Sequence, residues 1–457
     1  MRKEIVIPDI DKINERVMHS KEKALRISIF EGSAASVAEG AGGSYITPFA
    51  LALSATNFQV GLLSAFSGLL APIAQFYGSN LMERYSRKRI VIAFVLLQAL
   101  MWLPIAALSY FLWKGIFISY LPYALIVFYT ILAIFGGIAH PAWFSWMGDL
   151  VPENERGRYF GKRNRITGIV SLVAFLTVGY FIDIFKTKGL VLLGFAIIFA
   201  LSFTFRMFSF GFFHKQYCPK FKLEKGYYFS LWQFLRRYDN FGKFAVFQFA
   251  FNFAVMIASP FFAVYLLKDL GFNYLTFTIV SVSSSMFYLI FVPLAGKFSD
   301  KYGNRELLYV GSFLFVLTPL LIIFFKTPLT IILIPYLVSG LGNAAFTIAT
   351  NNFTYDAVNA PHRGLCVAYT NILAGIGVFL GSLLGGYIAS LDFGVKSAIV
   401  PVFIAAAFFR LLMVLVFVPG IKEVRKVQRS PHFSLSLVHP FKMINADVGW
   451  FKNFFRG

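Results

Sequence analysis

The feature that most constrains this chain is a series of long segments without charge. Residues 90–112 read IVIAFVLLQALMWLPIAALSYFL, with no charged side chain and one proline. A helix on the surface of a soluble protein carries a polar stripe at 3.6-residue spacing, and this segment has none. About 20 apolar residues in a helix span the hydrocarbon core of a bilayer. The segment is therefore predicted to be a transmembrane helix.

Eleven further segments have similar length and character. The predicted membrane helices cover residues 27–50, 58–82, 89–112, 118–148, 164–184, 189–213, 244–267, 275–298, 306–325, 328–355, 364–390 and 397–418. Only 14% of the residues are charged, against about 25% in soluble domains. So few charged residues cannot cover the surface of a soluble protein of this size, and the remaining apolar surface must face lipid. The sequence predicts an all-α integral membrane protein of twelve transmembrane helices.

The basic residues are sorted to one side of this arrangement. With the N-terminus placed inside, the interior segments hold 34 Lys and Arg residues and the exterior loops hold 6. Cytoplasmic loops carry such an excess, so both termini are predicted to be cytoplasmic, in a multi-pass protein of the cell membrane. The same sorting accounts for the net charge of +21 without nucleic acid as a partner.

These segments divide the chain into five parts. We expect a cytoplasmic N-terminal segment (1–26), a six-helix bundle (27–213), a cytoplasmic linker (214–243), a second six-helix bundle (244–418) and a cytoplasmic tail (419–457). The linker contains an amphipathic stretch that fits a helix lying on the lipid surface, and the aromatic and basic end of the tail fits a second anchor. Both segments suit simple adhesion to the bilayer, and regulation is the alternative. The two cysteines have no metal-site spacing, and we expect no metal and no cofactor.

The two predicted bundles repeat each other. The loop after the fourth helix runs from Asp149 to Arg156, and the loop after the tenth runs from Asp356 to Arg363, with the same spacing. Residues 83–88 match residues 300–305 in the same way, and the pair Phe205-Arg206 matches Phe409-Arg410. Parallel six-helix halves that meet around a site near the middle of the membrane are an arrangement used by transporters.

With these motifs the chain resembles the major facilitator superfamily. Residues 296–305, GKFSDKYGNR, are similar to the signature loop of that family between its second and third helices. Residues 78–89 are a second copy, in which Glu83 replaces the usual Asp and Ser86 the usual Gly. Residues 143–164 are similar to a prokaryotic branch whose substrates are generally not known. The resemblance implies two six-helix halves that expose a central site to each side of the membrane in turn.

Charged residues at the inner helix ends are candidates for the cytoplasmic gate. Carboxylate–guanidinium pairs are strong enough to bias one conformation and wet enough to break. We consider four such pairs, namely Asp149 with Arg156, Asp356 with Arg363, Glu83 with Arg84 or Arg87, and Asp300 with Lys301 or Arg305. The resemblance implies that such pairs hold the halves together when the protein faces outward. The alternative is that these charges only set the topology. The complete set of candidates is Glu83, Arg84, Arg87, Asp149, Arg156, Asp300, Lys301, Arg305, Asp356 and Arg363.

Glu39 is the main candidate for a site inside the membrane. It lies near the middle of the first predicted helix, in the small-residue stretch Gly32–Ser44. Small residues allow close helix packing and also leave room for a cavity around the carboxyl group. A carboxyl group so placed could take up a proton near neutral pH and bind protons or substrate. The alternative is a carboxyl group hydrogen-bonded to a neighbouring helix.

Other polar residues within the helices have less specific predictions. Glu31 is expected to pair with a basic residue, either Arg206 or Arg410. Snorkelling to the headgroups or a static ion pair is favoured for both arginines over anion binding. His140 could carry protons but more commonly such a residue makes a static hydrogen bond. The amides suit a neutral or zwitterionic solute, and equally suit interhelical hydrogen bonds; they are Gln248, Asn252 and Asn343.

The sequence therefore predicts a secondary transporter for a small organic solute, coupled to protons through Glu39. We expect a monomer that works in the lipid bilayer with its substrate and protons as partners. An uncoupled facilitator is the alternative within the same fold. A solute sensor or lipid-handling membrane protein is the alternative outside it. An enzyme is not expected, because the sequence contains no P-loop and no nucleophile elbow.

Overall fold

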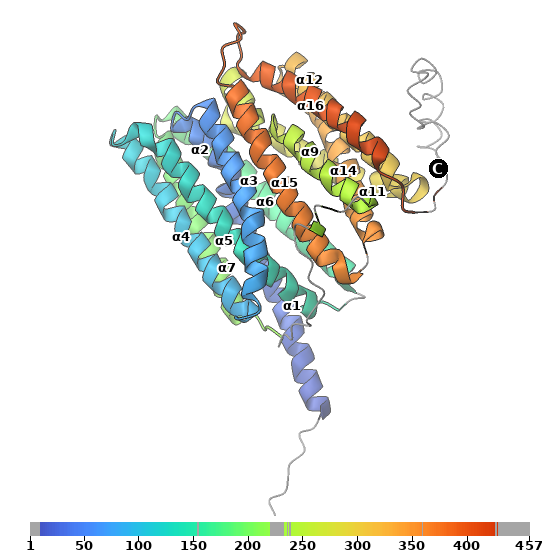
Figure 1. Cartoon of the computed structure of the whole chain (residues 1–457). Coiled ribbons are helices and arrows are strands. Elements are labelled where there is room, and N and C mark those ends of the chain that lie inside the picture. The colour runs from blue at the N-terminus through green and yellow to red at the C-terminus, as the bar shows by residue number, and fades with distance from the viewer. Residues whose placement is uncertain are drawn as a thin grey trace, which may run out of the picture.

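The structure, a computed structural model, describes residues 10–152, 155–219, 233, 234, 236, 239–358, 360–425 and 427. The side chains of 10–18, 157 and 360–365 are outside this description. The described chain is helical, with no strand in these ranges. Figure 1 shows the helices side by side in a bundle, with the first turns of α1 projecting beyond the others. The predicted all-α membrane fold is confirmed.

The first half of the chain, here the N-half, ends with α7. It comprises α1 (Ile10–Ala41), η1 (Gly43–Tyr45), α2 (Ile46–Ala52), α3 (Asn57–Leu81), α4 (Arg87–Trp113), η2 (Ile118–Tyr120), α5 (Leu121–Leu150), α6 (Arg156–Thr187) and α7 (Val191–Lys215). Side-chain caps fix the start of two of these helices. Thr56 and Gln59 form a capping box at α3, and the Ser86 hydroxyl accepts the Arg89 N–H at α4.

The second half, here the C-half, repeats this order with more interruptions. It comprises α9 (Asn240–Met256), η4 (Ser259–Phe261), α10 (Phe262–Val264), η5 (Tyr265–Asp269), α11 (Tyr274–Tyr302), α12 (Asn304–Phe324), α13 (Pro328–Ile331), η6 (Ile332–Tyr336), α14 (Leu337–Ala357), α15 (Ala360–Ile388), α16 (Ile399–Phe417) and η7 (Val418–Gly420). The predicted helices 244–267 and 328–355 are therefore interrupted, and η5 and η6 are π-helical turns.

Eleven helices in the described residues are long and apolar enough to cross a membrane. The segment 27–52 is not among them, because α1 carries charges at its start and small residues towards its end. The chain then passes through the short turn η1 before α2 begins. The count of twelve spans and the cytoplasmic placement of both termini remain predictions from the sequence.

Each half forms an open ring of helices with the same order of contacts. In the N-half the order is α3, α5, α4, α7, α1 and α6, and in the C-half it is α11, α14, α12, α16, α9 and α15. Each helix contacts the next one in its list. The halves then join through α3 with α15 and through α6 with α11, which closes a larger ring around a shared interior. The internal repeat in the sequence is thus matched by the packing of the helices.

Glycines set the distance between α9 and α15. A Cβ added at Gly377, Gly381 or Gly385 would collide with the backbone carbonyl oxygens of Phe249, Phe253 or Ile257, respectively. Small residues at such an interface let the two helix backbones approach closely.

The apolar core is shared by the two halves at one end of the molecule and is divided into two separate clusters at the other. We call the end with the loops after α3, α5, α11 and α14 the basic end. At the opposite end one cluster contains residues of both halves, among them Phe49 and Phe261. Towards the basic end there are two clusters, one in the N-half around Trp146 and one in the C-half around Phe353.

Polar contacts also join the halves at the opposite end. The hydroxyl groups of Tyr45 and Thr278 lie 2.5 Å apart, and Tyr45 also donates to the Phe175 carbonyl at 3.0 Å. The Asp183 carboxylate on α6 accepts the backbone N–H groups of Tyr274 and Leu275 at the start of α11, at 2.9 and 2.8 Å. A carboxylate at a helix N-terminus is stabilised by the unpaired N–H groups there. The structure is therefore closed at the opposite end.

Candidate functional site

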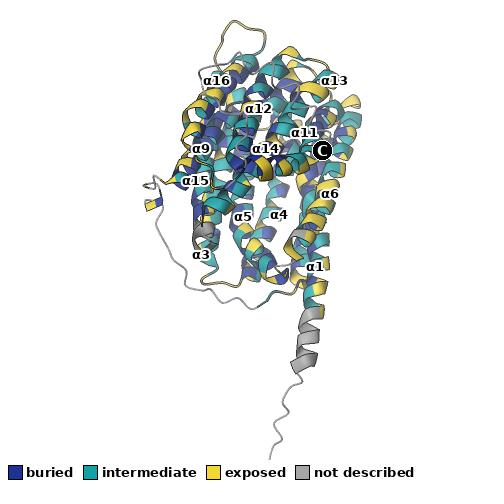
Figure 2. Cartoon of the chain, turned by 90° about the vertical axis from the view of Figure 1, so that its right-hand side faces the viewer, coloured by how far each residue is buried: buried dark blue, intermediate teal, exposed yellow. Residues whose placement is uncertain are grey.

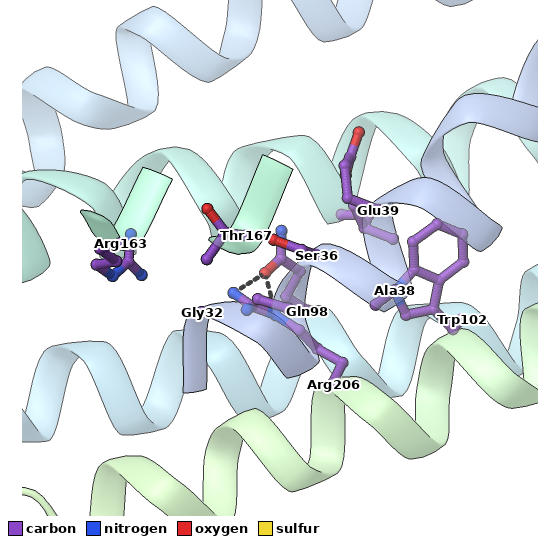
Figure 3. Close-up of a pocket in the computed structure, with 11 residues that line it drawn as sticks. Gly32, Ser36, Ala38, Glu39, Gln98, Trp102, Arg163, Thr167 and Arg206 are labelled. Carbon is purple, nitrogen blue, oxygen red and sulfur yellow. Dashed lines mark hydrogen bonds between the residues drawn. The ribbon is translucent and has the colours of Figure 1, made fainter. Parts of the chain in front are cut away.

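A cavity of about 270 Å³ lies inside the open ring of the N-half. Figure 3 shows its lining, which comes from α1, α4, α5, α6 and α7 and comprises Gly32, Ala35, Ser36, Ala38, Glu39, Gln98, Trp102, Leu132, Arg163, Thr167 and Arg206. Within a wall of small and apolar residues, the charged groups are one carboxyl group and two guanidinium groups. The small residues of α1 thus leave space beside the carboxyl group, as the sequence suggests.

Glu31 lies behind this cavity and has its partners close by. It is 3% exposed. Arg163 donates to it at 3.3 Å, Ser209 donates at 2.9 Å, and an Arg206 nitrogen lies 4.0 Å away. Arg206 also donates to the Gln98 side-chain oxygen at 2.9 and 2.5 Å. Of the two partners considered from sequence, the structure places Arg206 beside Glu31.

Arg163 is a site residue that the sequence analysis missed. Its position in the basic run 156–165 suggests a cytoplasmic loop, and the fifth helix is predicted to begin at 164. That boundary is wrong, because α6 begins at Arg156 and places Arg163 two turns inside the helix. The guanidinium group lies over the Trp143 ring, 4.8 Å from its centroid. The sequence does hold a signal for this placement: Arg163 directly precedes the predicted helix 164–184, so extending that helix towards its N-terminus includes it.

Glu39 is placed quite differently from Glu31. The residue is exposed, and its side chain makes no hydrogen bond or ion pair with any described residue. In Figure 3 its carboxyl group points away from the hydrogen-bonded pair of Gln98 and Arg206. The carboxylate lies over Gly43, where an added Cβ would collide with it. The glycine therefore leaves room for this carboxyl group, and Glu39 itself is one of the residues that line the cavity.

Arg410 does not join the acidic residues, although it occupies the position equivalent to Arg206. It is 1% exposed and has no acidic partner among the described residues. It donates to the Phe315 carbonyl at 2.7 Å and to the Val255 carbonyl at 2.9 Å. Pro319 has no N–H with which to bond Phe315 in α12, and α9 ends at Met256. Arg410 therefore satisfies carbonyl groups at two helix irregularities instead of pairing with Glu31.

The other polar candidates lie apart from the N-half cavity. His140 is exposed on α5 and stacks on Phe144, with ring centroids 6.3 Å apart. The half-buried Asn252 amide donates to the Gln248 backbone carbonyl at 2.8 Å and lies 3.4 Å from the Gln248 side-chain oxygen. Asn343 is exposed on α14 and accepts from the Thr347 hydroxyl at 3.1 Å.

A second cavity of about 260 Å³ lies inside the open ring of the C-half. It carries no charged side chain among its lining residues, which are Phe262, Ser281, Ser284, Ser285, Thr318, Ile322, Pro335, Tyr336 and Ser339. The Ser281 hydroxyl donates to the Phe277 carbonyl at 2.7 Å, and Ser284 donates to Ser339 at 3.2 Å. The hydroxyl groups of Ser285 and Tyr336 have no hydrogen-bond partner among the described residues.

At the basic end of the N-half, the gate candidates bond within the half. Arg87 is 1% exposed and donates to Asp149 at 2.6 Å, in place of the Asp149–Arg156 pair considered from sequence. It also donates to the Ser145 carbonyl at 2.9 Å. Arg156 donates to the Gly148 carbonyl at 3.0 Å. Of the remaining candidates in this half, Glu83 and Arg84 are exposed.

The C-half uses a residue that the sequence analysis did not select. Arg425, just beyond α16, donates to Asp356 at 2.6 Å and lies 3.3 Å from Asp300. Asn304 occupies the position equivalent to Arg87 and also donates to Asp356, at 2.8 Å. The guanidinium group missing at Asn304 is thus supplied by the segment after the last helix. The expected pairs of Asp300 with Lys301 or Arg305 are replaced by this contact.

The remaining candidates at this end have other contacts. The Lys301 ammonium lies 5.1 Å from the centroid of the Tyr302 ring. Arg305 pairs with Glu306 at 3.8 Å. The side chain of Arg363 and the predicted anchor in the tail lie outside the described residues. The linker helix within 214–243 also lies outside them, apart from a few positions.

Comparison with known proteins agrees with this architecture. A family model described as Major Facilitator Superfamily matches residues 33–257 and again 244–452. The chain is similar to vacuolar basic amino acid transporter 1 of Saccharomyces cerevisiae, with 31% identity over 32% of this chain and 28% of the relative. It is also similar to a class H tetracycline resistance protein of Pasteurella multocida, with 28% identity over 28% of this chain and 30% of the relative. These matches span less than a third of each relative.

Among solved structures, the fold is similar to that of a D-xylose-proton symporter. The superposition covers 89% of this chain and 99% of the symporter, with a TM-score of 0.65 and 15% sequence identity. The two matched segments of the family model correspond to the two rings of helices and together include most of the described residues. The chain therefore belongs to the Major Facilitator Superfamily.

Proposed function

We propose that this protein is a secondary transporter that moves a small organic solute by alternating access, and that Glu39 couples this movement to protons. The observation that carries the proposal is the open carboxyl group of Glu39 in a cavity inside the ring of helices. Family membership and the similarity to transporters support it. The proposal includes the cell membrane as the location and the predicted five-part division of the chain.

The arrangement of contacts supports alternating access. The halves share one core and several hydrogen bonds at the opposite end, while each half keeps its own core towards the basic end. The ion pairs at the basic end, Arg87 with Asp149 and Arg425 with Asp356, lie within a half and leave the halves free to approach. If the basic end is cytoplasmic, this conformation faces inward. The gate candidates would then exchange partners when that end closes.

The proton role follows from the surroundings of Glu39. The titratable groups around it are Arg206 on α7, Tyr129 on α5, Arg163 on α6 and Glu31 on its own helix. Glu31 already has Arg163, Arg206 and Ser209 as partners. Glu39 has none, so a change in its protonation requires no ion pair to break.

The test is transport by the full chain in proteoliposomes. A panel of labelled sugars, amino acids, organic acids, nucleosides and organic cations is offered with and without a pH gradient. We expect one class to be moved faster with the gradient, and Glu39→Gln to abolish that acceleration while exchange without a gradient continues. Glu22→Gln makes the same chemical change at an exposed position on the same helix and should behave as wild type. Transport with equal pH dependence in both variants would contradict coupling through Glu39 and favour the uncoupled facilitator.

A further inference from the structure

We propose that the substrate is a hydroxylated organic cation. Its ammonium group would bind Glu39 in the N-half cavity, and its hydroxyl groups would bind Ser285 and Tyr336 in the C-half cavity. This inference rests on the proposed transport function and adds the class of substrate. The inference rests on a comparison of the polar side chains in the two cavities. Some already have hydrogen-bond or ion-pair partners within the protein, and others have none.

The two arginines of the N-half cavity are occupied. Arg206 uses its guanidinium nitrogens on Gln98, Ser209 and Glu31. Arg163 donates to Ser28 and Glu31 and lies over the Trp143 ring. All three guanidinium nitrogens of Arg206 and two of the three of Arg163 thus have protein partners, which weakens both arginines as sites for an anionic substrate.

The carboxyl group of Glu39 is open by contrast. Two arginines and two glutamates make the cavity and its surroundings neutral when both acids are ionised. A bound monovalent cation and a bound proton therefore give this region the same net charge, and only Glu39 is free to receive either. The cation is thus expected to compete with protons, with the groups named above, Arg206, Arg163, Tyr129 and Glu31, as the charged and titratable surroundings.

The C-half cavity offers neutral hydrogen-bonding groups. Ser281 and Ser284 donate within the protein, but Ser285 and Tyr336 have no partner among the described residues. Hydroxyl groups both donate and accept, so they match hydroxyl groups of a ligand. No charged side chain lines this cavity, which leaves the charge recognition to Glu39.

Each cavity has a lining residue close in sequence to the contact that closes the opposite end. That contact joins Tyr45 to Thr278. Glu39 precedes Tyr45 by six residues, and Ser285 follows Thr278 by seven. At 1.5 Å per helical residue, the separation within α11 is about 10 Å. On the other side, α1 ends at Ala41 and the chain reaches Tyr45 through the short turn η1. The contacts of α3 with α15 and of α6 with α11 join the two half-rings into one larger ring. The proposal places one solute within it, beneath the Tyr45–Thr278 contact, where it would face both cavities.

A matched series of solutes tests this inference with the full chain in lipid nanodiscs. N-methylglucamine, sorbitol and gluconate share a hydroxylated six-carbon chain and carry a positive, neutral or negative end group. Equilibrium dialysis with labelled N-methylglucamine at pH 7.5 gives its affinity, and competition gives the other two. We expect N-methylglucamine to bind at least tenfold more tightly than sorbitol or gluconate, and more weakly at pH 5.5.

Variants separate the two parts of the site. Glu39→Gln should weaken N-methylglucamine binding at least tenfold, because an ammonium group loses its charged partner. Glu22→Gln is the control and should bind as wild type. Ser285→Ala with Tyr336→Phe should weaken N-methylglucamine several-fold and leave tetraethylammonium, which has no hydroxyl groups, unchanged. Ser283→Ala is the control, because Ser283 is buried outside the cavity lining and its hydroxyl donates to the Val280 carbonyl; it should have little effect on binding.

Several results would overturn the inference. These are tighter binding of gluconate, equal binding of all three solutes, unchanged binding in Glu39→Gln, or no binding of either cation at millimolar concentration. Binding of N-methylglucamine without exchange across proteoliposomes would support the site and contradict transport. Proton-coupled movement of a neutral or anionic solute would support transport and contradict the cation site.

Discussion

Arg206 and Arg410 show how equivalent residues acquire different partners. Both follow a phenylalanine in the last helix of their half, and both are enclosed by neighbouring helices. Arg206 bonds side chains, namely Gln98, Ser209 and Glu31. Arg410 bonds two backbone carbonyls, that of Phe315, which a proline leaves without its helical donor, and that of Val255 at the end of α9. In a membrane, such freed carbonyls need a partner from a neighbouring helix.

We predict that Arg410 and Pro319 are energetically coupled. Arg410→Gln should lower the melting temperature, because the Phe315 carbonyl loses its 2.7 Å donor. Pro319→Ala restores a backbone N–H in α12 that can bond Phe315, so the same arginine change should cost less in that background. A double-mutant cycle by thermal unfolding in detergent should give a coupling of about 1 kcal/mol. Additive effects would contradict this account of Arg410.

At the scale of elements, the interruptions and close contacts of the helices decide where functional groups lie. The end of α1 at Ala41 places Gly43 next to the Glu39 carboxylate. Helix α6 begins at Arg156, before the predicted start at 164, and this brings Arg163 into the bundle. Glycines of α15 bring its backbone against α9. The second half has more interruptions than the first, in α9–η5 and in α13–η6.

Packing of α15 against α9 gives a prediction for Gly381. A methyl group at this position would collide with the Phe253 carbonyl, so Gly381→Ala should destabilise the protein by roughly 1–3 kcal/mol. Gly168→Ala is the control, because nothing lies within 4 Å of a Cβ on that helical glycine. It should be neutral or slightly stabilising. Thermal unfolding of both variants measures this, and equal effects would contradict the packing argument.

Much of the fold could be predicted from the sequence, because apolar length and charge sorting are local properties. The choice of Glu39 as a candidate rests on a charge in an apolar segment rich in small residues. Partners of the charges could not be predicted, because they depend on helix rotation and on where each helix begins. For that reason Arg163 falls in a predicted loop although it pairs with Glu31, and Arg425 falls in the predicted tail although it contacts Asp300 and Asp356.

Arg425 carries a prediction about the segment after the last helix. Without it, Asp356 keeps Asn304 as a donor but loses its charged partner. Arg425→Ala should therefore destabilise the protein by about 1 kcal/mol, since the pair is partly exposed. Lys422→Ala, at an exposed position nearby, should leave the melting temperature unchanged. A melting temperature insensitive to both changes would show that Arg425 does not stabilise the C-half.

For the whole molecule, two similar open rings meet at one end and separate towards the other. Figure 2 shows buried residues throughout the packed helices, while exposed residues lie on the outer surfaces and at the ends. Because the shared core lies at the opposite end, rocking of the halves about α3–α15 and α6–α11 would open that end as the basic end closes. Protonation of Glu39 is the event proposed to bias this motion.

The most direct measurement is the distance between the halves at each end as a function of pH. Spin labels at Tyr85 and Lys301 report on the basic end, and labels at Lys188 and Lys326 report on the opposite end, in a protein whose two cysteines are first replaced by serine. Pulsed electron resonance should show opposite changes in these two distances between pH 8 and pH 5.5. Both changes should be lost in Glu39→Gln and kept in Glu22→Gln. Distances that do not change with pH, or that change equally in Glu39→Gln, would contradict the account.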